Sequence, residues 1–186
     1  MPAPSLGRLE WQPALTRPDL LAPAVSAALQ QDHAAWAREC YVAPIDEDLA
    51  DTAAFCAAYA VPLEASANCV VVAGRRGETS TTAACLVLAT DRADVNRAVR
   101  HQLGVRKISF APMAEATELS QMAYGGITPV GLPAGWPLLV DEAVTVQPWV
   151  VIGSGLRGSK LLLPGRATGD LAGAEVASIR QVSGAG

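Results

Sequence analysis

The sequence predicts an α+β domain built on a mixed, mostly antiparallel sheet, and three observations support this class. Helical and strand-like patterns are intermixed along the 186 residues, and no internal repeat is visible. Two apolar runs, 69–74 and 82–90, are joined by a polar turn too short for a parallel crossover, which indicates a hairpin. Hydrophobic residues make up 51% of the chain and charged residues 17%, a balance typical of a folded core and not of a disordered chain.

Residues 1–38 are expected to form an N-terminal arm and helix, and residues 39–186 the main domain. Scattered prolines and a lack of periodicity indicate an extended arm up to residue 22, pinned by Trp11. Pro23 suits the first turn of a helix that ends near Gln31. A short strand is expected at 39–44.

Three further helices are expected between the strands. The acids at 46–48 favour a helix start, and Pro62 closes that helix. A second helix is expected from Asp91 to Gly104, followed by a strand at 105–110. A third, at 112–122, would carry an apolar stripe of Met113, Ala116, Leu119 and Ala123. The C-terminal part is expected to contain strands at 138–141, 143–146, 149–152 and 160–163, a small helix near 168–172 and a last strand near 176–179.

The charge, the cysteine content and the hydropathy of the sequence argue against several classes of protein. A formal net charge of −4 argues against a general DNA- or RNA-binding surface, although a protein that touches only one end of an RNA needs few cations. The four cysteines show no CxxC spacing and only two histidines exist, so we expect reduced, buried thiols and neither metal nor cofactor. The apolar runs are too short for a membrane span, and the N-terminus lacks a signal-peptide layout. We therefore expect a cytoplasmic protein.

A glycine-rich segment at 124–131, with the sequence Tyr-Gly-Gly-Ile-Thr-Pro-Val-Gly, is the most informative stretch. Its glycines allow a close backbone approach to a ligand, and Pro129 stiffens the loop. Backbone N–H groups held in this way can stabilise the oxyanion of an ester under attack. The same composition is also typical of an ordinary turn.

A second glycine-rich segment, 153–160, contains Arg157 and Lys160. It is either a phosphate-facing loop or a hairpin turn with solvated cations. Asn68, before the first apolar run, is either a cap at the start of a strand or a polar group that faces a pocket. Thr128 and Ser159 are either ligands for a water or ribose hydroxyl, or turn hydroxyls that bond their own backbone.

Other polar residues favour structural roles. Asp141 is interpreted as a cap at the end of a strand, and His101 and His33 as surface histidines. No nucleophile elbow, Walker loop or metal motif is present, so a Ser-His-Asp mechanism is not expected.

These motifs, in this order, resemble the YbaK/EbsC/ProX family of aminoacyl-tRNA deacylases over residues 39–180. The segment 124–131 is similar to the family's G-G-[IV]-[ST]-P-x-G loop, and 155–158 to its G-x-R-G turn. The resemblance implies a barrel-like sheet flanked by helices. It also implies hydrolysis of the ester between a wrong amino acid and the tRNA 3′ end, after release from a synthetase such as prolyl-tRNA synthetase.

The resemblance also implies site residues. The family's GxxxP loop, which holds the aminoacyl carbonyl, corresponds to Gly125, Gly126, Ile127, Thr128 and Pro129, with water or a substrate hydroxyl as the attacking group. Further expected contacts to the substrate are Arg157, Gly155, Ser159, Tyr124, Met122 and Leu119, with Ala67 also beside the pocket.

Two positions depart from the family pattern. The family's usual lysine corresponds to Asn68, and Lys160 stands where many members carry an aspartate. We expect Lys160 to replace the missing ammonium and Asn68 to orient the carbonyl or amino group. The alternatives are a non-catalytic module that binds a tRNA end or a synthetase, and a hydrolase or transferase of other small aminoacyl esters.

Overall fold

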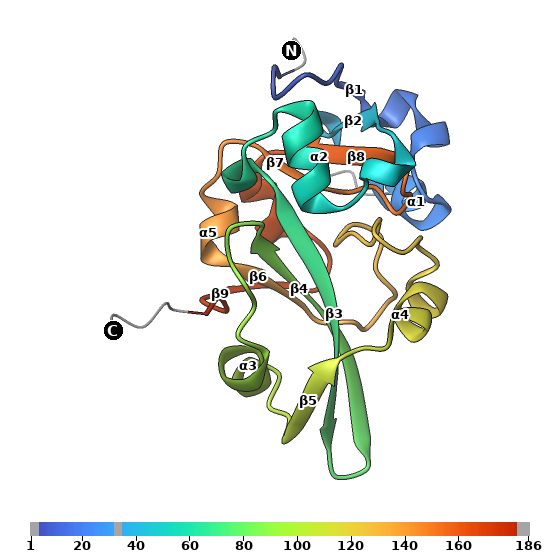
Figure 1. The fold of residues 1–186 in the computed structure, drawn as a ribbon. Coiled ribbons are helices and arrows are strands. Elements are labelled where there is room, and N and C mark those ends of the chain that lie inside the picture. Colours follow the sequence, from blue (N-terminus) through green and yellow to red (C-terminus); the bar gives the residue numbers. More distant parts are fainter. Residues whose placement is uncertain (1–3, 32–34, 182–186) are drawn as a thin grey trace, which may run out of the picture.

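The computed structural model describes residues 4–31 and 35–181 and arranges them in two sheets with flanking helices (Figure 1). The four-stranded sheet has the order β1-β2-β8-β7 and is antiparallel throughout; its strands are β1 (Gln12–Pro13), β2 (Tyr41–Pro44), β8 (Ser159–Leu163) and β7 (Val150–Gly153). The five-stranded sheet has the order β5-β3-β4-β6-β9; its strands are β5 (Lys107–Phe110), β3 (Ala67–Arg76), β4 (Thr79–Leu88), β6 (Leu138–Asp141) and β9 (Ala174–Ala177).

The α+β class and the mostly antiparallel pairing are confirmed. In the five-stranded sheet only the β4–β6 and β6–β9 pairs are parallel. No closed barrel is formed by the strands that the structure describes, because a single bridge between Ser66 and Val151 is all that links the two ladders.

The helices are α1 (Pro23–Gln31), α2 (Thr52–Tyr59), α3 (Arg100–Gln102), α4 (Met113–Ser120) and α5 (Glu142–Thr145). Aspartate side chains cap two of the helices, α2 and α5. Helix α1 has the expected bounds. The helix expected at residue 46 begins instead at Thr52, because the Asp51 carboxylate accepts a hydrogen bond from the Ala53 N–H at 3.1 Å. The acids at 46–48 belong to a separate 3₁₀ turn, Glu47–Leu49.

The helix expected from Asp91 begins later, as the π-helical turn η6 (Val95–Val99), and continues into α3. Its cap is Asp94, whose carboxylate accepts from the Arg97 N–H at 3.2 Å. Val95 and Val99 are buried, and His101 is exposed, as expected of a surface histidine. His33 lies outside the described residues.

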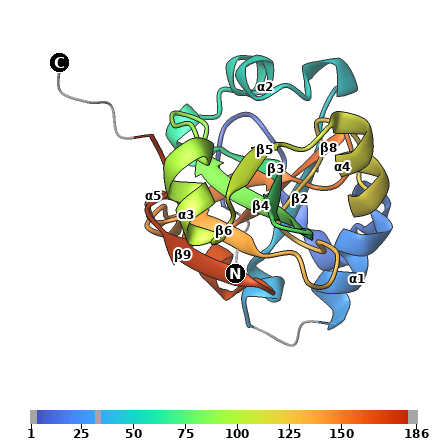
Figure 2. The ribbon, with the colours of Figure 1, turned by 90° about the horizontal axis from the view of Figure 1, so that it is seen from below.

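The apolar stripe expected on α4 is wrong. Met113 and Leu119 are 54% and 48% exposed, whereas Ala116 and Ser120 are buried. In both views α4 and α3 lie on opposite sides of the β3–β4 hairpin (Figures 1 and 2).

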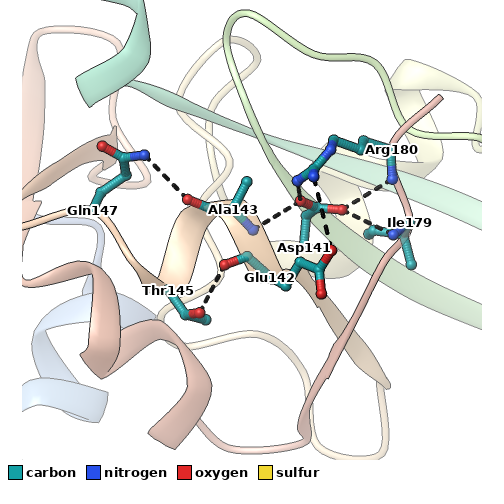
Figure 3. A network of polar contacts seen from close by, with 7 residues as sticks. All are labelled: Asp141, Glu142, Ala143, Thr145, Gln147, Ile179 and Arg180. Atoms are coloured by element: carbon teal, nitrogen blue, oxygen red, sulfur yellow. Dashed lines mark hydrogen bonds and ion pairs between the residues drawn. The ribbon is translucent and has the colours of Figure 1, made fainter. Parts of the chain in front are cut away.

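The strand expected at 143–146 is also wrong, since this segment begins as the helix α5. The cap is Asp141, which is 1% exposed and accepts from the Ala143 N–H at 3.0 Å. The same carboxylate accepts from the backbone N–H groups of Ile179 and Arg180 and pairs with the Arg180 guanidinium at 2.8 Å (Figure 3). Asp141 therefore joins β6, α5 and the C-terminal segment, which confirms its interpretation as a cap.

The largest buried cluster lies between the two sheets and includes Val25 and Leu29 of α1 beside Leu86, Leu138 and Leu161. All four cysteines are free thiols. Trp11 is buried and donates to the Leu6 carbonyl at 2.9 Å, which supports the expectation that it pins the N-terminal arm. In the described part of the chain, no helix has the length and apolar character needed to cross a membrane.

Candidate active site

A cleft of about 630 Å³ opens where the start of α2, the start of β3, the loop at 124–127 and the strands β7 and β8 meet. Six of the residues expected at or beside the site line it: Ala67, Asn68, Tyr124, Gly125, Ile127 and Lys160. They come from three separate parts of the sequence. The fold thus brings the first glycine-rich loop and the two positions that depart from the family pattern into one cavity.

The two glycine-rich segments pack against each other, backbone to backbone. The Gly155 N–H donates to the Gly126 carbonyl at 2.7 Å, and the Ala123 N–H donates to the Gly155 carbonyl at 2.8 Å. A Cβ atom on Gly126 would lie 2.5 Å from the Leu156 carbonyl oxygen, and one on Gly153 would overlap the Gly126 carbonyl. Glycine is therefore required sterically at both positions.

This packing presents the edge of the loop to the cleft. Gly125 adopts φ +77°, which favours glycine, and the Gly126 N–H is used internally by the Ala123 carbonyl at 2.9 Å. For the N–H groups of Gly125 and Ile127, the described residues provide no backbone acceptor. Gly126, Thr128 and Pro129 are buried behind them and do not line the cleft. Two amides of a stiff loop are thus free to bind an anionic oxygen.

Lys160 supplies the positive charge of the cleft. It is 7% exposed, and its Nζ donates to the Ala50 carbonyl at 2.9 Å and lies 5.2 Å from the centre of the Phe55 ring. Burial lowers the pKa of Lys160, an effect that Cys56 and Asp51 oppose and Arg157 reinforces. One hydrogen bond leaves two of the three ammonium protons for a ligand.

Asn68 is held by a neighbour on α2. Its Oδ1 accepts a 2.6 Å hydrogen bond from the Thr52 hydroxyl, and both residues line the cleft. Asn68 therefore faces the pocket, as the second interpretation of this residue, a polar group beside a pocket, predicts. Asp51 also lines the cleft. Sequence reasoning missed Asp51 and Thr52, although an Asp-Thr pair before an alanine-rich run is a recognisable helix start.

Comparison with known families decides the identity, since residues 46–170 match the aminoacyl-tRNA editing domain. The chain belongs to this family. The comparison with curated proteins found no match to this chain. The solved structures that share its fold include the following two. A candidate trans-editing enzyme for prolyl tRNA synthetase has a TM-score of 0.73 and 22% identity, over 87% of this chain and 97% of that chain. The hypothetical protein APE2540 has a TM-score of 0.67 and 21% identity, over 75% of this chain and 90% of that chain.

Arg157 of the editing domain holds the loop rather than lining the cleft. Its guanidinium donates to the carbonyls of Tyr124 at 3.1 Å and Glu47 at 3.0 Å, and it lies 5.9 Å from the Tyr124 ring centre. A Cβ atom added to Gly125 would lie 2.9 Å from Arg157 Nη1. In this structure Arg157 therefore positions the segment that carries the free amides.

Four other expected contact residues of the editing domain lie away from the cleft. Met122 and Gly155 are buried in the fold, and Leu119 is exposed on α4. The Ser159 hydroxyl is buried and bonds the Leu20 carbonyl at 2.7 Å.

The buried Thr128 hydroxyl finds no hydrogen-bond partner among the described residues, which does not fit the interpretation as a turn hydroxyl that bonds its own backbone.

The thiols of the editing domain are poor nucleophiles. Cys69 lines the cleft, but burial raises the pKa of its thiol, and burial also raises the pKa of Cys56 beside Lys160. Within the described ranges, no group of three or more His, Cys, Asp or Glu side chains is placed to hold a metal ion. The cleft therefore offers backbone amides and an ammonium group, both of which stabilise negative charge.

Proposed function

We propose that this chain is a trans-acting aminoacyl-tRNA deacylase that hydrolyses the ester of mischarged tRNA. The observation that supports this most directly is the meeting of the free amides of Gly125 and Ile127 with the Lys160 ammonium in one cleft. An ester carbonyl bound there would have its developing oxyanion stabilised from two sides. Family membership supplies the substrate class.

The attacking group in this proposal is water, or a ribose hydroxyl of the substrate that first takes the acyl group and then loses it to water. With water, its oxygen adds to the acyl carbon, and the tetrahedral intermediate collapses as the C–O bond to the ribose breaks. The proton lost by water ends on the ribose oxygen, and the products are the free amino acid and the tRNA. The raised pKa of the Cys69 thiol argues against a covalent acyl-enzyme.

Lys160 takes the place of the lysine that other family members carry at the position of Asn68. The Lys160 ammonium polarises the ester or neutralises the terminal phosphate, and the Asn68 amide, fixed by Thr52, orients the carbonyl or amino group. The partners are the aminoacyl-tRNA 3′ end and, as for the solved trans-editing neighbour, a prolyl-tRNA synthetase. The boundary at residue 38 remains a prediction.

The test is to incubate the protein with a panel of labelled aminoacyl-tRNAs and to follow release of the amino acid. Turnover of at least one mischarged tRNA, above the rate without protein, is the expected result. Binding without turnover would support a non-catalytic module. Turnover of small aminoacyl esters or thioesters, but of no aminoacyl-tRNA, would support the third alternative.

A further inference from the structure

A second hollow, of about 470 Å³, lies at the far end of the five-stranded sheet and is strongly basic. Four arginines and a histidine line it: Arg76, Arg97, Arg100, Arg106 and His101. No acidic residue is part of the lining. We refer to these five residues as the arginine hollow.

The charge of the arginine hollow is uncompensated. Within the described residues none of its four arginines forms an ion pair, whereas the adjacent Arg75 pairs with Glu78 at 3.6 Å. The whole chain carries 14 cationic and 18 acidic residues. Without the four arginines of the hollow, ten cationic residues remain against 18 acidic ones, so the rest of the protein is strongly acidic. Four unpaired guanidinium groups in one concavity of an acidic protein indicate a site for a polyanion.

The backbone fixes the shape of this hollow. The Val105 N–H donates to the Arg100 carbonyl at 3.2 Å, and the Arg106 N–H to the Arg75 carbonyl at 2.9 Å. A Cβ on Gly74 would lie 2.9 Å from Val105, so β3 and the turn after α3 are closely packed. Arg76 Nη1 donates to the Gly104 carbonyl at 3.3 Å, which turns its side chain across the gap.

The arginine hollow and the catalytic cleft lie at the two ends of the same strand. Asn68 lines the cleft near the start of β3, and Arg76 ends this strand. At about 3.3 Å per residue the two positions are roughly 26 Å apart. Their even spacing places both side chains on one face of the sheet. Figure 1 shows α3 and β5 at the opposite end of the molecule from α2.

We propose that the arginine hollow binds the phosphate backbone of the tRNA at a distance from the ester. This inference rests on the proposed function, because a tRNA whose ester occupies the cleft brings a long chain of phosphates with it. A site roughly 26 Å from Asn68 is too far to touch the terminal nucleotide, so it would contact RNA further along the backbone. Guanidinium groups suit phosphates because they donate paired hydrogen bonds.

The test compares a double variant, Arg97→Ala with Arg100→Ala, with a matched control, Arg8→Ala with Arg38→Ala. All four arginines are exposed and free of ion pairs with described residues, and only the first two line the hollow. Binding of uncharged tRNA is measured by fluorescence anisotropy over a range of salt concentrations, with circular dichroism as a check of folding. The hollow variant should bind roughly tenfold more weakly, with a salt slope lower by about 0.7–0.9 per lost contact. The control should bind as the native protein does.

Hydrolysis separates this inference from the proposed function. Cleavage of an aminoacyl-adenosine ester, which cannot reach the hollow, should be unchanged in the hollow variant, while KM for aminoacyl-tRNA rises. Weaker tRNA binding together with no hydrolysis of any ester would sustain the hollow and refute the deacylase. Equal tRNA binding by hollow variant and control, or no tRNA binding by the native protein, would overturn the hollow as an RNA site.

Discussion

The ammonium of Lys160 is anchored to the Ala50 carbonyl by a 2.9 Å hydrogen bond. Ala50 directly precedes Asp51, the N-cap of α2, so the segment that begins this helix also fixes the charge in the cleft. Phe55 of the same helix covers the ammonium from another side. The position of Lys160 is thus set by α2 as well as by its own strand, β8.

Lys160→Met should abolish most of the deacylase activity. This change removes the ammonium and keeps the length of the side chain, so we expect kcat/KM for an aminoacyl-adenosine ester to fall by about 100-fold or more. Thermal stability should be little changed, because a largely buried charge is lost. The matched control is Lys107→Met on the exposed surface of β5, which should retain activity. Native activity in Lys160→Met would refute the assigned role.

Binding of a non-hydrolysable aminoacyl-adenosine analogue should weaken as the pH rises. Burial lowers the pKa of Lys160 from its ordinary value of 10.5, so the ammonium loses its proton at a lower pH than an exposed lysine would. The dissociation constant, measured by calorimetry, should therefore increase below pH 10.5. This inflection should be absent in Lys160→Met. A dissociation constant that stays level up to pH 10.5 would contradict the prediction.

Asn68→Lys should not improve catalysis. The new ammonium would share the cleft with Lys160, repel it, and remove the hydrogen bond from the Thr52 hydroxyl. We expect kcat/KM at or below the native value. Thr52→Val removes the same hydrogen bond without adding charge and serves as the control. A rise in kcat/KM in Asn68→Lys would show that Lys160 does not replace the family lysine.

Gly126→Ala should destabilise the protein and lower its activity. The added methyl group would lie 2.5 Å from the Leu156 carbonyl oxygen, and backbone cannot easily move aside. We expect a loss of about 1–3 kcal/mol in the free energy of unfolding, measured by urea titration. Gly135→Ala is the comparison. A Cβ atom at Gly135 would meet no other atom, but the residue has φ +85°, a conformation that alanine disfavours, so we expect a loss of about 1 kcal/mol in the free energy of unfolding. Equal losses in the two variants would argue against tight contact between the loops.

Asp141→Ala should destabilise the C-terminal segment. It leaves the N–H groups of Ile179 and Arg180 and the Arg180 guanidinium without their acceptor (Figure 3). We expect the free energy of unfolding to fall by about 2–4 kcal/mol. Glu78→Ala, which removes an exposed partner of Arg75, should cost less than about 1 kcal/mol. Hydrogen exchange that stays slow at Ile179 would contradict this role for Asp141.

Local signals in the sequence were sufficient where capping and periodicity agree. Pro23 places the start of α1, and the apolar run with its polar turn predicts the β3–β4 hairpin. The strand expected at 143–146 failed because Val144 and Thr145 favour strands by propensity, while the Asp141 cap and burial of Val144 favour a helix. The parallel pairing of β6 with β4 and β9 is a long-range choice that no local pattern specifies.

The site was partly predictable for the same reason. The glycine loop, Asn68 and Lys160 were expected to share one pocket, and they line one cleft. Asp51 and Thr52 were missed because the acids at 46–48 led us to expect the helix to begin at residue 46, whereas it begins at Thr52. Arg157 was expected to contact phosphate, but the sequence could not show that the carbonyls of Tyr124 and Glu47 occupy its guanidinium.

The backbone hydrogen bonds at Gly126 and Gly155 join the two glycine-rich segments, 124–131 and 153–160, into one rigid unit. Anyone who wishes to transplant this loop into a relative, or to evolve it toward another amino acid, must therefore exchange both stretches together. A library that diversifies one stretch alone should keep Gly126, Gly153 and Gly155 fixed, because their backbones are in close contact.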